Sequence, residues 1–207
     1  FMILKVRMIK QGKFELLEFS NQEDCFKELQ KEGKEIKKKK KLIVLPGGKT
    51  PLPFYKDYLN NKFDHYLLSD ERLSNDRNKR NEVNITEIAP HIKFITSLLE
   101  FDYKNNDHTN NLTQLLTKIG KPDIAILGMG DDGHYASIFK NSDTLFNCKK
   151  NTFKIISLRG DPNSTIRLTL TTQYIQSASR IIFLISGKAK IKIIRDISIA
   201  RKSIESL

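Results

Sequence analysis

The sequence predicts a single α/β domain over residues 1–207, with a doubly wound, mainly parallel sheet that carries helices on both faces in the Rossmann-like manner. Three observations lead to this prediction. Short apolar runs alternate along the chain with amphipathic, helix-like stretches. The runs are continuously apolar, which is typical of parallel strands buried on both faces. A length of 207 residues without repeats or a low-complexity linker suits one domain.

The elements follow in chain order. Residues 2–6 and 14–19 predict an opening pair of strands. An amphipathic helix is expected over residues 21–38, beginning at Ser20 or Asn21, because both side chains are good helix caps. Further strands are expected at residues 42–45, 65–69, 92–96, 124–127, 153–158 and 180–185. Further helices are expected at residues 50–60, 81–88, 109–119, 170–178 and 189–203.

The composition excludes several classes of protein. An apolar content of 39% supports a packed core and argues against a disordered chain. No apolar run approaches the ~20 residues that span a bilayer, and the N-terminus lacks a signal-peptide pattern, so we expect a cytoplasmic protein with no membrane partner. The two cysteines, Cys25 and Cys148, are too few for a disulfide framework and are expected to be reduced thiols.

The net charge of +12 raises the hypothesis of a nucleic-acid partner. Much of the excess lies in residues 31–41, which hold seven lysines and two glutamates. Such a run is typical of a solvated helix face and linker, and no helix-turn-helix, zinc-finger or aromatic–basic pattern accompanies it. A basic protein also attracts small phosphorylated anions, so the charge alone does not distinguish a nucleic acid from a small phosphorylated ligand. Because no nucleic-acid-binding pattern is present, we expect no nucleic-acid partner.

The first functional motif is the turn after the third predicted strand. Gly47 and Gly48 leave backbone N–H groups accessible to a ligand. The following helix, with Thr50 as its expected N-cap and Pro51 at its first helical position, adds partial positive charge, and Lys49 adds a full charge. These features suit an anion site, although an ordinary tight turn between a strand and a helix explains the two glycines equally well in isolation.

The second motif directly follows the strand expected at residues 65–69. From this position Asp70 and Glu71 can orient a substrate or a proton. Arg72 can bind a phosphate group through two parallel hydrogen bonds. A helix cap with a local ion pair explains the same three residues, so the motif by itself does not decide between a site and a structural role.

The third motif, residues 123–139, carries the strongest chemical signal. A predicted strand runs into three glycines, two aspartates and a histidine before a new helix is expected. Asp132 lies two residues from His134, where it can orient the imidazole for general acid–base chemistry. A metal site is disfavoured because no third ligand lies at a convincing spacing. The other histidines have unremarkable surroundings: His65, His91 and His108.

Two basic residues near predicted strand ends complete the set of candidates. Arg167 precedes the helix expected at residues 170–178, and Lys190 follows the strand expected at residues 180–185. On a chain with 36 basic residues, a solvated side chain is the ordinary explanation for either of them. Their significance depends on the order of all the motifs along the chain.

That order resembles the 6-phosphogluconolactonase family, which belongs to the fold group of glucosamine-6-phosphate isomerase/deaminase, the NagB/RpiA type. The shared patterns are Gly-Gly-x-Thr-Pro, Asp-Glu-Arg, Gly-x-Gly-x-Asp-Gly-His-x-Ala-Ser-x-Phe, Arg-x-Thr-Leu-Thr and Gly-x-x-Lys, spread over residues 42–190. Five motifs in the family's order argue against coincidence. The sequence departs from the family where Pro46 and Lys49 each replace a serine, and where Arg80-Asn81 replaces Ser-Asn.

The resemblance implies hydrolysis of 6-phosphogluconolactone to 6-phosphogluconate in the oxidative pentose phosphate pathway, without a metal or organic cofactor. His134 would be the general base that activates water and then the acid that protonates the leaving ring oxygen, while Asp132 and Asp70 would shape the site around the sugar. The residues that would hold the phosphate or line its pocket are Gly47, Gly48, Lys49, Thr50, Arg72, Gly130, Arg167 and Lys190. The expected partner is this sugar lactone, with the chain a monomer or a weak homodimer.

Two other functions stay open on the sequence. The nearer one is an isomerase/deaminase of an amino-sugar phosphate, but in that relative a catalytic glutamate follows the histidine block, whereas residues 135–141 contain no carboxylate. The other is a catalytically silent sugar-phosphate sensor, because the same fold serves as an effector domain in some transcription regulators. Those regulators carry a separate DNA-binding segment, which we do not expect in a chain of 207 residues.

Overall fold

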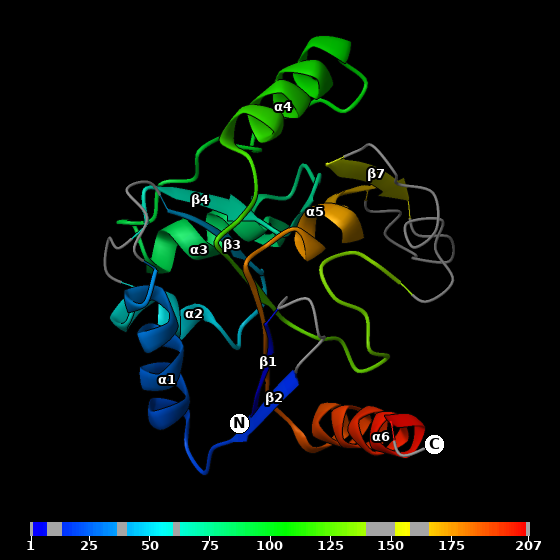
Figure 1. The fold of residues 1–207 in the computed structure, drawn as a ribbon. Coiled ribbons are helices and arrows are strands. Elements are labelled where there is room, and N and C mark those ends of the chain that lie inside the picture. Colours follow the sequence, from blue (N-terminus) through cyan, green and yellow to red (C-terminus); the bar gives the residue numbers. More distant parts are fainter. Residues whose placement is uncertain are drawn as a thin grey trace.

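The computed structural model describes residues 2–7, 14–36, 41–59, 63–139, 152–157 and 166–205 (Figure 1). The strands are β1 (Met2–Arg7), β2 (Phe14–Glu18), β3 (Leu42–Leu45), β4 (His65–Leu68), β5 (Asp70–Arg72), β6 (Ile124–Leu127), β7 (Phe153–Ser157), β8 (Ile166–Leu170) and β9 (Arg180–Ile185). The helices are α1 (Gln22–Lys34), α2 (Leu52–Asp57), α3 (Asn81–Ile88), α4 (Asn106–Ile119), α5 (Thr172–Gln176) and α6 (Lys188–Glu205), with a short 3-10 helix η1 (Arg77–Lys79).

Six strands form the large sheet, in the order β2-β1-β9-β6-β3-β4. Strands β9, β6, β3 and β4 run parallel, while β1 pairs antiparallel with β9 and with β2 at one edge. From β3 the chain proceeds to β4 on one side, and β6 later enters on the other side, so the direction of winding changes between β3 and β6. The predicted doubly wound, mainly parallel sheet is confirmed, and ligands of such sheets bind beyond the strand ends at this point.

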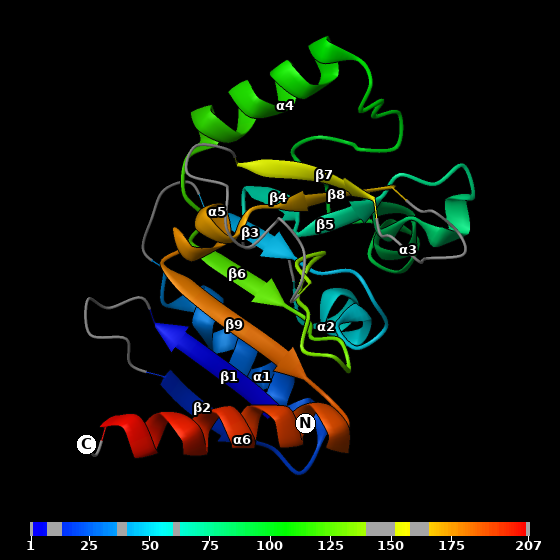
Figure 2. The same cartoon turned by 90° about the vertical axis from the view of Figure 1, so that its right-hand side faces the viewer.

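Helices cover both faces of the large sheet, as predicted. Figure 2 shows α1 behind the sheet and α6 in front of it. On the α1 side the rings of Phe26, Phe54 and Tyr58 pack together, with the centroids of Phe26 and Phe54 5.6 Å apart. On the α6 side, the buried residues Ile185 and Ile194 pack together. Strands β3 and β6 are buried along their whole length, because both of their faces lie against other elements.

The sequence does not predict the second sheet, which has the order β5-β8-β7 and is antiparallel. It lies above the large sheet in Figure 2, with α4 beyond it. The strand expected at residues 153–158 is β7 and belongs to this sheet. Strand β5 has three polar residues and β8 lies where a loop before a helix is expected. Strand β5 has no strand-like local pattern, because none of its residues is apolar. Strand β8 does alternate apolar and polar residues, but it lies directly before the expected helix and is not predicted.

Side-chain caps set several helix boundaries that differ from the prediction. Helix α1 begins as predicted after Asn21, whose side chain accepts a backbone hydrogen bond at 2.9 Å, but it ends at Lys34 and not at residue 38. Helix α4 begins earlier than expected because Asn105 caps it at 2.9 Å, and α5 begins later because Thr171 caps it at 3.2 Å. Residues 92–96 are not a strand, since Phe94 makes an isolated bridge to β4.

Two expectations from composition concern cysteine and membrane contact. Cys25 is fully buried in α1, and burial raises the pKa of its thiol to about 11, so it is an unreactive core residue as expected. Cys148 lies outside the described residues. Within the described ranges, no helix has the length and apolar character needed to cross a bilayer.

Candidate active site

An open cleft of about 220 Å³ lies at the carboxyl ends of β3, β6 and β9, and residues of the small sheet form part of its wall. The cleft brings together every predicted site residue except Asp132. These lining residues are Gly47, Gly48, Lys49, Thr50, Asp70, Arg72, Gly130, His134, Arg167 and Lys190. Segments far apart in the sequence therefore converge where the winding of the sheet changes direction.

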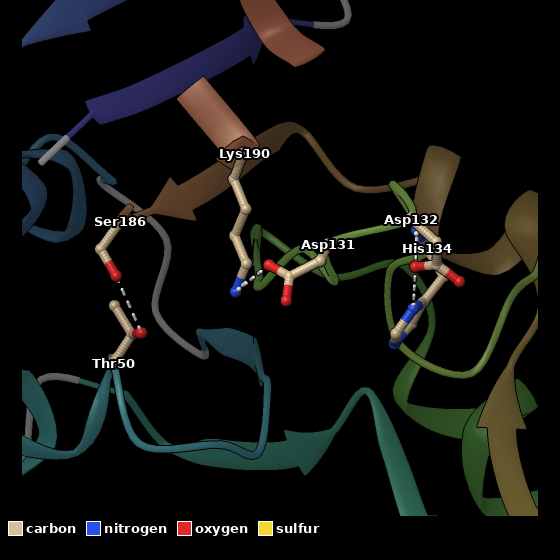
Figure 3. Close-up of polar contacts among 6 residues, drawn as sticks. All are labelled: Thr50, Asp131, Asp132, His134, Ser186 and Lys190. Atoms are coloured by element: carbon tan, nitrogen blue, oxygen red, sulfur yellow. Dashed lines mark hydrogen bonds and ion pairs between the residues drawn. The ribbon is translucent and has the colours of Figure 1, made fainter. Parts of the chain in front are cut away.

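His134 lies on the loop after β6, with its ring held by Asp132 (Figure 3). Its Nδ1 is 2.5 Å from Asp132 Oδ1, and the same oxygen accepts the backbone N–H of His134 at 3.1 Å. An ionised carboxylate can only accept hydrogen bonds, so Nδ1 carries the proton and donates it. The other ring nitrogen, Nε2, then holds a lone pair, as a general base requires.

The carboxylate of Asp132 suits this role. Burial acts to raise its pKa, but the hydrogen bonds from the ring and backbone of His134 outweigh that effect and hold the pKa below its ordinary value. The carboxylate is therefore ionised at neutral pH and keeps the proton on Nδ1. The side chain of Asp132 is 64% exposed and is not part of the cleft lining, so it orients His134 from outside the cleft.

The imidazole ring lies directly against Gly130. A β-carbon at this position would come within 2.2 Å of Nδ1 and Cε1 of His134, so glycine is required for the observed ring position. The backbone N–H of Gly130 also donates to the carbonyl oxygen of His134 at 2.8 Å. Phe139 packs against the ring, with the two centroids 4.4 Å apart. The loop thus fixes the histidine through its backbone, its Nδ1 and its ring.

The segment after His134 differs from the prediction, because no helix begins within residues 134–139. A tight turn replaces it, in which the N–H of Ile138 donates to the carbonyl of Tyr135 at 2.9 Å. Ala136 in this turn has φ of 48°, a left-handed conformation that costs of order 1 kcal/mol or more for a residue other than glycine. The contacts of the neighbouring residues must hold this strained backbone in place.

Asp70 lines the cleft from the start of β5, and two hydroxyl groups hold its carboxylate. Ser137 Oγ donates to Oδ2 at 2.7 Å, and Ser69 Oγ donates to Oδ1 at 3.1 Å. Asp70 is only 7% exposed, so its orientation depends on these two bonds more than on solvent. The cleft therefore contains a carboxylate in a fixed orientation, suited to accept hydrogen bonds from the hydroxyls of a ligand.

Glu71 does not line the cleft. Its carboxylate accepts the backbone N–H groups of Asn81 at 2.8 Å, Glu82 at 2.9 Å and Arg72 at 2.6 Å. Glu71 thereby caps α3, whose N-cap residue, Arg80, makes no side-chain capping bond. Burial raises the pKa of Glu71, although these hydrogen bonds oppose the rise. Of the two explanations of this motif, the structural one holds for Glu71.

Replacing Glu71 with alanine is expected to lower the free energy of unfolding by about 2–4 kcal/mol, because three backbone N–H groups lose their acceptor. Urea denaturation followed by circular dichroism measures this change. Glu87→Ala, at an exposed position of the same helix, is the matched control and should change the free energy by less than about 0.5 kcal/mol. Equal stability of the two variants would show that α3 does not depend on the Glu71 cap.

The turn after β3 requires both of its glycines. Gly48 has φ of 89°, and a β-carbon on Gly47 would come within 2.2 Å of the Asn81 side chain. The carbonyl oxygen of Pro46 accepts a hydrogen bond from the Tyr55 hydroxyl at 2.7 Å, which anchors the start of the turn. The replacement of a serine by proline at this position therefore leaves the turn well anchored, with Asn81 packed against it.

Two arginines lie side by side on the small sheet. Arg72 of β5 and Arg167 of β8 are directly opposite each other in the antiparallel register, and both line the cleft. Like charges in this arrangement repel one another. The Nε atom of Arg72 is buried and forms no hydrogen bond with the described residues. An anionic group bound in the cleft would offset the repulsion and supply acceptors, so this pair is suited to a phosphate.

Lys190 and Thr50 complete the cleft (Figure 3). Lys190 Nζ is 3.7 Å from Asp131 Oδ1, and Thr50 Oγ1 is 3.2 Å from Ser186 Oγ. The predicted N-cap role of Thr50 is wrong, because α2 begins at Leu52 with a proline as its N-cap. The turn instead brings the Thr50 hydroxyl to the loop after β9, so this residue belongs to the cleft and not to the helix cap.

The sequence does not single out several residues that contribute to the site. These are Asn81, Ser137, Phe139 and Ser186. Ser137 and Phe139 belong to the histidine motif, which was a signal that they could be near the site. Asn81, Ser137 and Ser186 contact residues of other elements, so the local pattern could not have assigned their roles. Phe139 packs against His134 of its own loop.

His91 and His108 form hydrogen bonds away from the cleft. His91 Nε2 is 2.9 Å from the carbonyl oxygen of Leu59, and His108 Nδ1 accepts the backbone N–H of Asp102 at 3.0 Å. In the part of the chain that the structure describes, no three His, Cys, Asp or Glu side chains gather as metal ligands would. His134 is thus the histidine that the fold brings to the cleft.

Comparison with known proteins identifies related sequences. A family model described as glucosamine-6-phosphate isomerases/6-phosphogluconolactonase matches residues 22–205. The chain is 33% identical over 173 residues to a 6-phosphogluconolactonase of Thermotoga maritima, which covers 77% of this chain and 76% of that protein. It is 30% identical over 194 residues to a 6-phosphogluconolactonase of Helicobacter pylori, which covers 86% of this chain and 83% of that protein.

Solved structures share the fold. The crystal structure of the Thermotoga maritima 6-phosphogluconolactonase superposes with a TM-score of 0.67 at 30% identity, covering 87% of each chain. A monomeric glucosamine-6-phosphate deaminase superposes with a TM-score of 0.69 at 21% identity, covering 87% of this chain and 86% of that one. The two TM-scores are nearly equal, so the fold alone does not distinguish a lactonase from a deaminase.

Proposed function

The chain belongs to the glucosamine-6-phosphate isomerase/6-phosphogluconolactonase family, and we propose that within this family it acts as a 6-phosphogluconolactonase. It hydrolyses 6-phospho-D-glucono-1,5-lactone to 6-phosphogluconate, a reaction of the oxidative pentose phosphate pathway. The two curated relatives described above, at 33% and 30% identity, are named for this activity. The observation that carries the proposal is the His134–Asp132 pair, held against Gly130 beside a cleft with cationic walls.

His134 is the general base of the first step. Its Nε2 lone pair takes a proton from a water molecule while the water oxygen attacks the carbonyl carbon of the lactone. This forms a tetrahedral intermediate and an imidazolium ion. The ionised carboxylate of Asp132, 2.5 Å from Nδ1, stabilises that positive charge. A base positioned in this way accelerates a reaction by about 10²–10⁴-fold.

In the second step the proton transfer is reversed, and His134 acts as the general acid. The bond between the former carbonyl carbon and the ring oxygen breaks, and the imidazolium of His134 returns its proton to the departing oxygen. His134 is neutral again, and the new carboxylic acid loses its proton to solvent. The sum is lactone plus water giving the open-chain acid, so the reaction needs no oxidant, reductant or transferred group.

The phosphate of the substrate binds at the paired Arg72 and Arg167, where an anion offsets the repulsion of the two guanidinium groups. Lys190 and residues 47–50 complete the cationic wall, and the backbone N–H groups of the glycine turn add donors. Asp70 accepts hydrogen bonds from the sugar hydroxyls. Because the phosphate is remote from the reacting carbon, its binding energy orients the lactone carbonyl at His134.

The alternative function is isomerisation and deamination of glucosamine-6-phosphate. Residues 135–141 contain no acidic side chain that could assist His134 in that reaction. A catalytically silent sugar-phosphate-binding protein is the other alternative, and the oriented His134–Asp132 pair argues against it because binding a phosphate requires no such pair. The proposed lactonase activity and the two alternatives each predict a different outcome in one assay.

That assay compares fresh 6-phosphogluconolactone with glucosamine-6-phosphate. We expect faster opening of the lactone than in buffer, which must be subtracted because the lactone opens spontaneously, and no release of ammonia from glucosamine-6-phosphate. Ammonia release without lactone acceleration would instead identify a deaminase. Binding of 6-phosphogluconate without turnover of either compound would identify a sensor.

A further inference from the structure

We propose that Ser137 is a positioning residue for the lactonase reaction, an inference that rests on the function proposed above. Ser137 is fully buried and does not line the cleft, so it does not contact the substrate. Its hydroxyl fixes the carboxylate of Asp70, and its backbone fixes the His134 loop to the small sheet. Through these two contacts it sets the position of both groups relative to the lactone.

Three segments of the chain meet at Ser137. Its Oγ donates to Asp70 Oδ2 at 2.7 Å, and its backbone N–H donates to Thr169 Oγ1 at 3.2 Å. Asp70 and Thr169 are opposite each other in the register of β5 and β8. Ser137 therefore joins the loop of His134, three residues earlier, to two neighbouring strands through one side chain and one amide.

The Ser137 hydroxyl makes the shorter of the two hydroxyl contacts to the Asp70 carboxylate, since Ser69 Oγ lies at 3.1 Å. Without it, Oδ2 of a nearly buried carboxylate would lose its donor, and the group would turn to find another. The strained backbone of Ala136, with φ of 48°, directly precedes this anchor. Such strain persists only where surrounding contacts hold it. Loss of the hydrogen bond from Ser137 to Asp70 therefore also allows the His134 loop to relax.

Removing the Ser137 hydroxyl should slow the chemical step more than it weakens substrate binding. The proposed phosphate site consists of Arg72 and Arg167, which line the cleft, whereas Ser137 does not line it. Ser137→Ala is therefore expected to lower kcat for 6-phosphogluconolactone by about 10–100-fold, because displacement of a reacting group by ~1 Å costs on the order of 10²-fold. KM should change by less than about 3-fold, since ground-state binding through the phosphate is retained.

A double-mutant cycle tests whether Ser137 acts through Asp70. Ser137→Ala is compared in the wild-type chain and in the Asp70→Ala chain, with kcat and KM measured for each. In the Asp70→Ala background the serine substitution should lower kcat by less than about 3-fold, because the carboxylate that it holds is already absent. The same loss of kcat in both backgrounds would overturn the proposal.

Two further variants keep the test decisive. Ser177→Ala removes a hydroxyl that donates to the Tyr174 carbonyl at 2.6 Å outside the cleft, and it should leave kcat unchanged. Ser137→Cys keeps a weak donor and should give a kcat between those of serine and alanine, which remains measurable if Ser137→Ala does not fold. Wild-type kcat in both Ser137 variants would overturn this inference alone. A wild-type chain that does not accelerate lactone opening would overturn the proposed function and this inference together.

Discussion

Replacing His134 with alanine is expected to lower kcat for 6-phosphogluconolactone by about 10²–10⁴-fold, because the variant lacks the group that takes a proton from water and returns it to the ring oxygen. Binding of 6-phosphogluconate should change little, since the cationic residues of the cleft remain in place. Initial rates corrected for spontaneous opening measure the first effect, and titration calorimetry with 6-phosphogluconate measures the second.

His108→Ala is the matched control for this substitution. The His108 ring accepts a backbone N–H at 3.0 Å and lies outside the cleft, so its removal also deletes an imidazole and one hydrogen bond. We expect wild-type kcat in this variant. Wild-type turnover in the His134→Ala chain would contradict the role of His134, whereas equal losses in both variants would indicate damage to the fold.

Gly130→Ala is expected to lower kcat by about 10²-fold while His134 itself is retained, because a shift of ~1 Å in a reacting group has a cost of this size. The added methyl group would lie 2.2 Å from two ring atoms of His134 and 2.8 Å from Asp132 Oδ1. The ring must therefore move, and its hydrogen bond to Asp132 must lengthen or break. Steady-state kinetics on the purified variant measures the loss.

Gly128→Ala provides the control for the Gly130 prediction. Gly128 is on the same loop and lines the same cleft, but a β-carbon there would meet no atom within 4 Å. We expect kcat within about 3-fold of wild type for this variant, because an unhindered methyl group displaces nothing. If Gly130→Ala were as active as Gly128→Ala, the ring position against Gly130 would not matter for catalysis.

Much of the large sheet is predictable because its signals are local. The apolar runs at residues 42–45 and 124–127 are β3 and β6, and the helix expected at residues 81–88 is α3. In the small sheet only β7 is predicted, from the run at residues 153–158. Strand β5 is three polar residues long, and it exists because Asp70 pairs with Thr169 from a distant part of the chain.

The candidate site was predictable where its residues follow strand ends. The Gly47–Gly48 turn and the His134 loop have recognisable residue types at those positions, and the structure brings both to the cleft. The roles of two further residues could be assigned only from the tertiary structure. Glu71 caps α3, and Thr50 faces Ser186 instead of capping α2. A carboxylate or hydroxyl near a helix start has the same local sequence in either role, so its partner has to be seen.

The sequence by itself determined the chemical groups of this protein and the strand ends that carry them, above all His134 with Asp132 two residues away. Periodicity and turn chemistry arise between neighbours in the chain, and they can therefore be recognised without the fold. Only the tertiary structure decided that Arg72 lies opposite Arg167 and that Ser137 holds Asp70. These contacts join residues far apart in the chain, and no local pattern records which distant side chain will complete a hydrogen bond or share an anion.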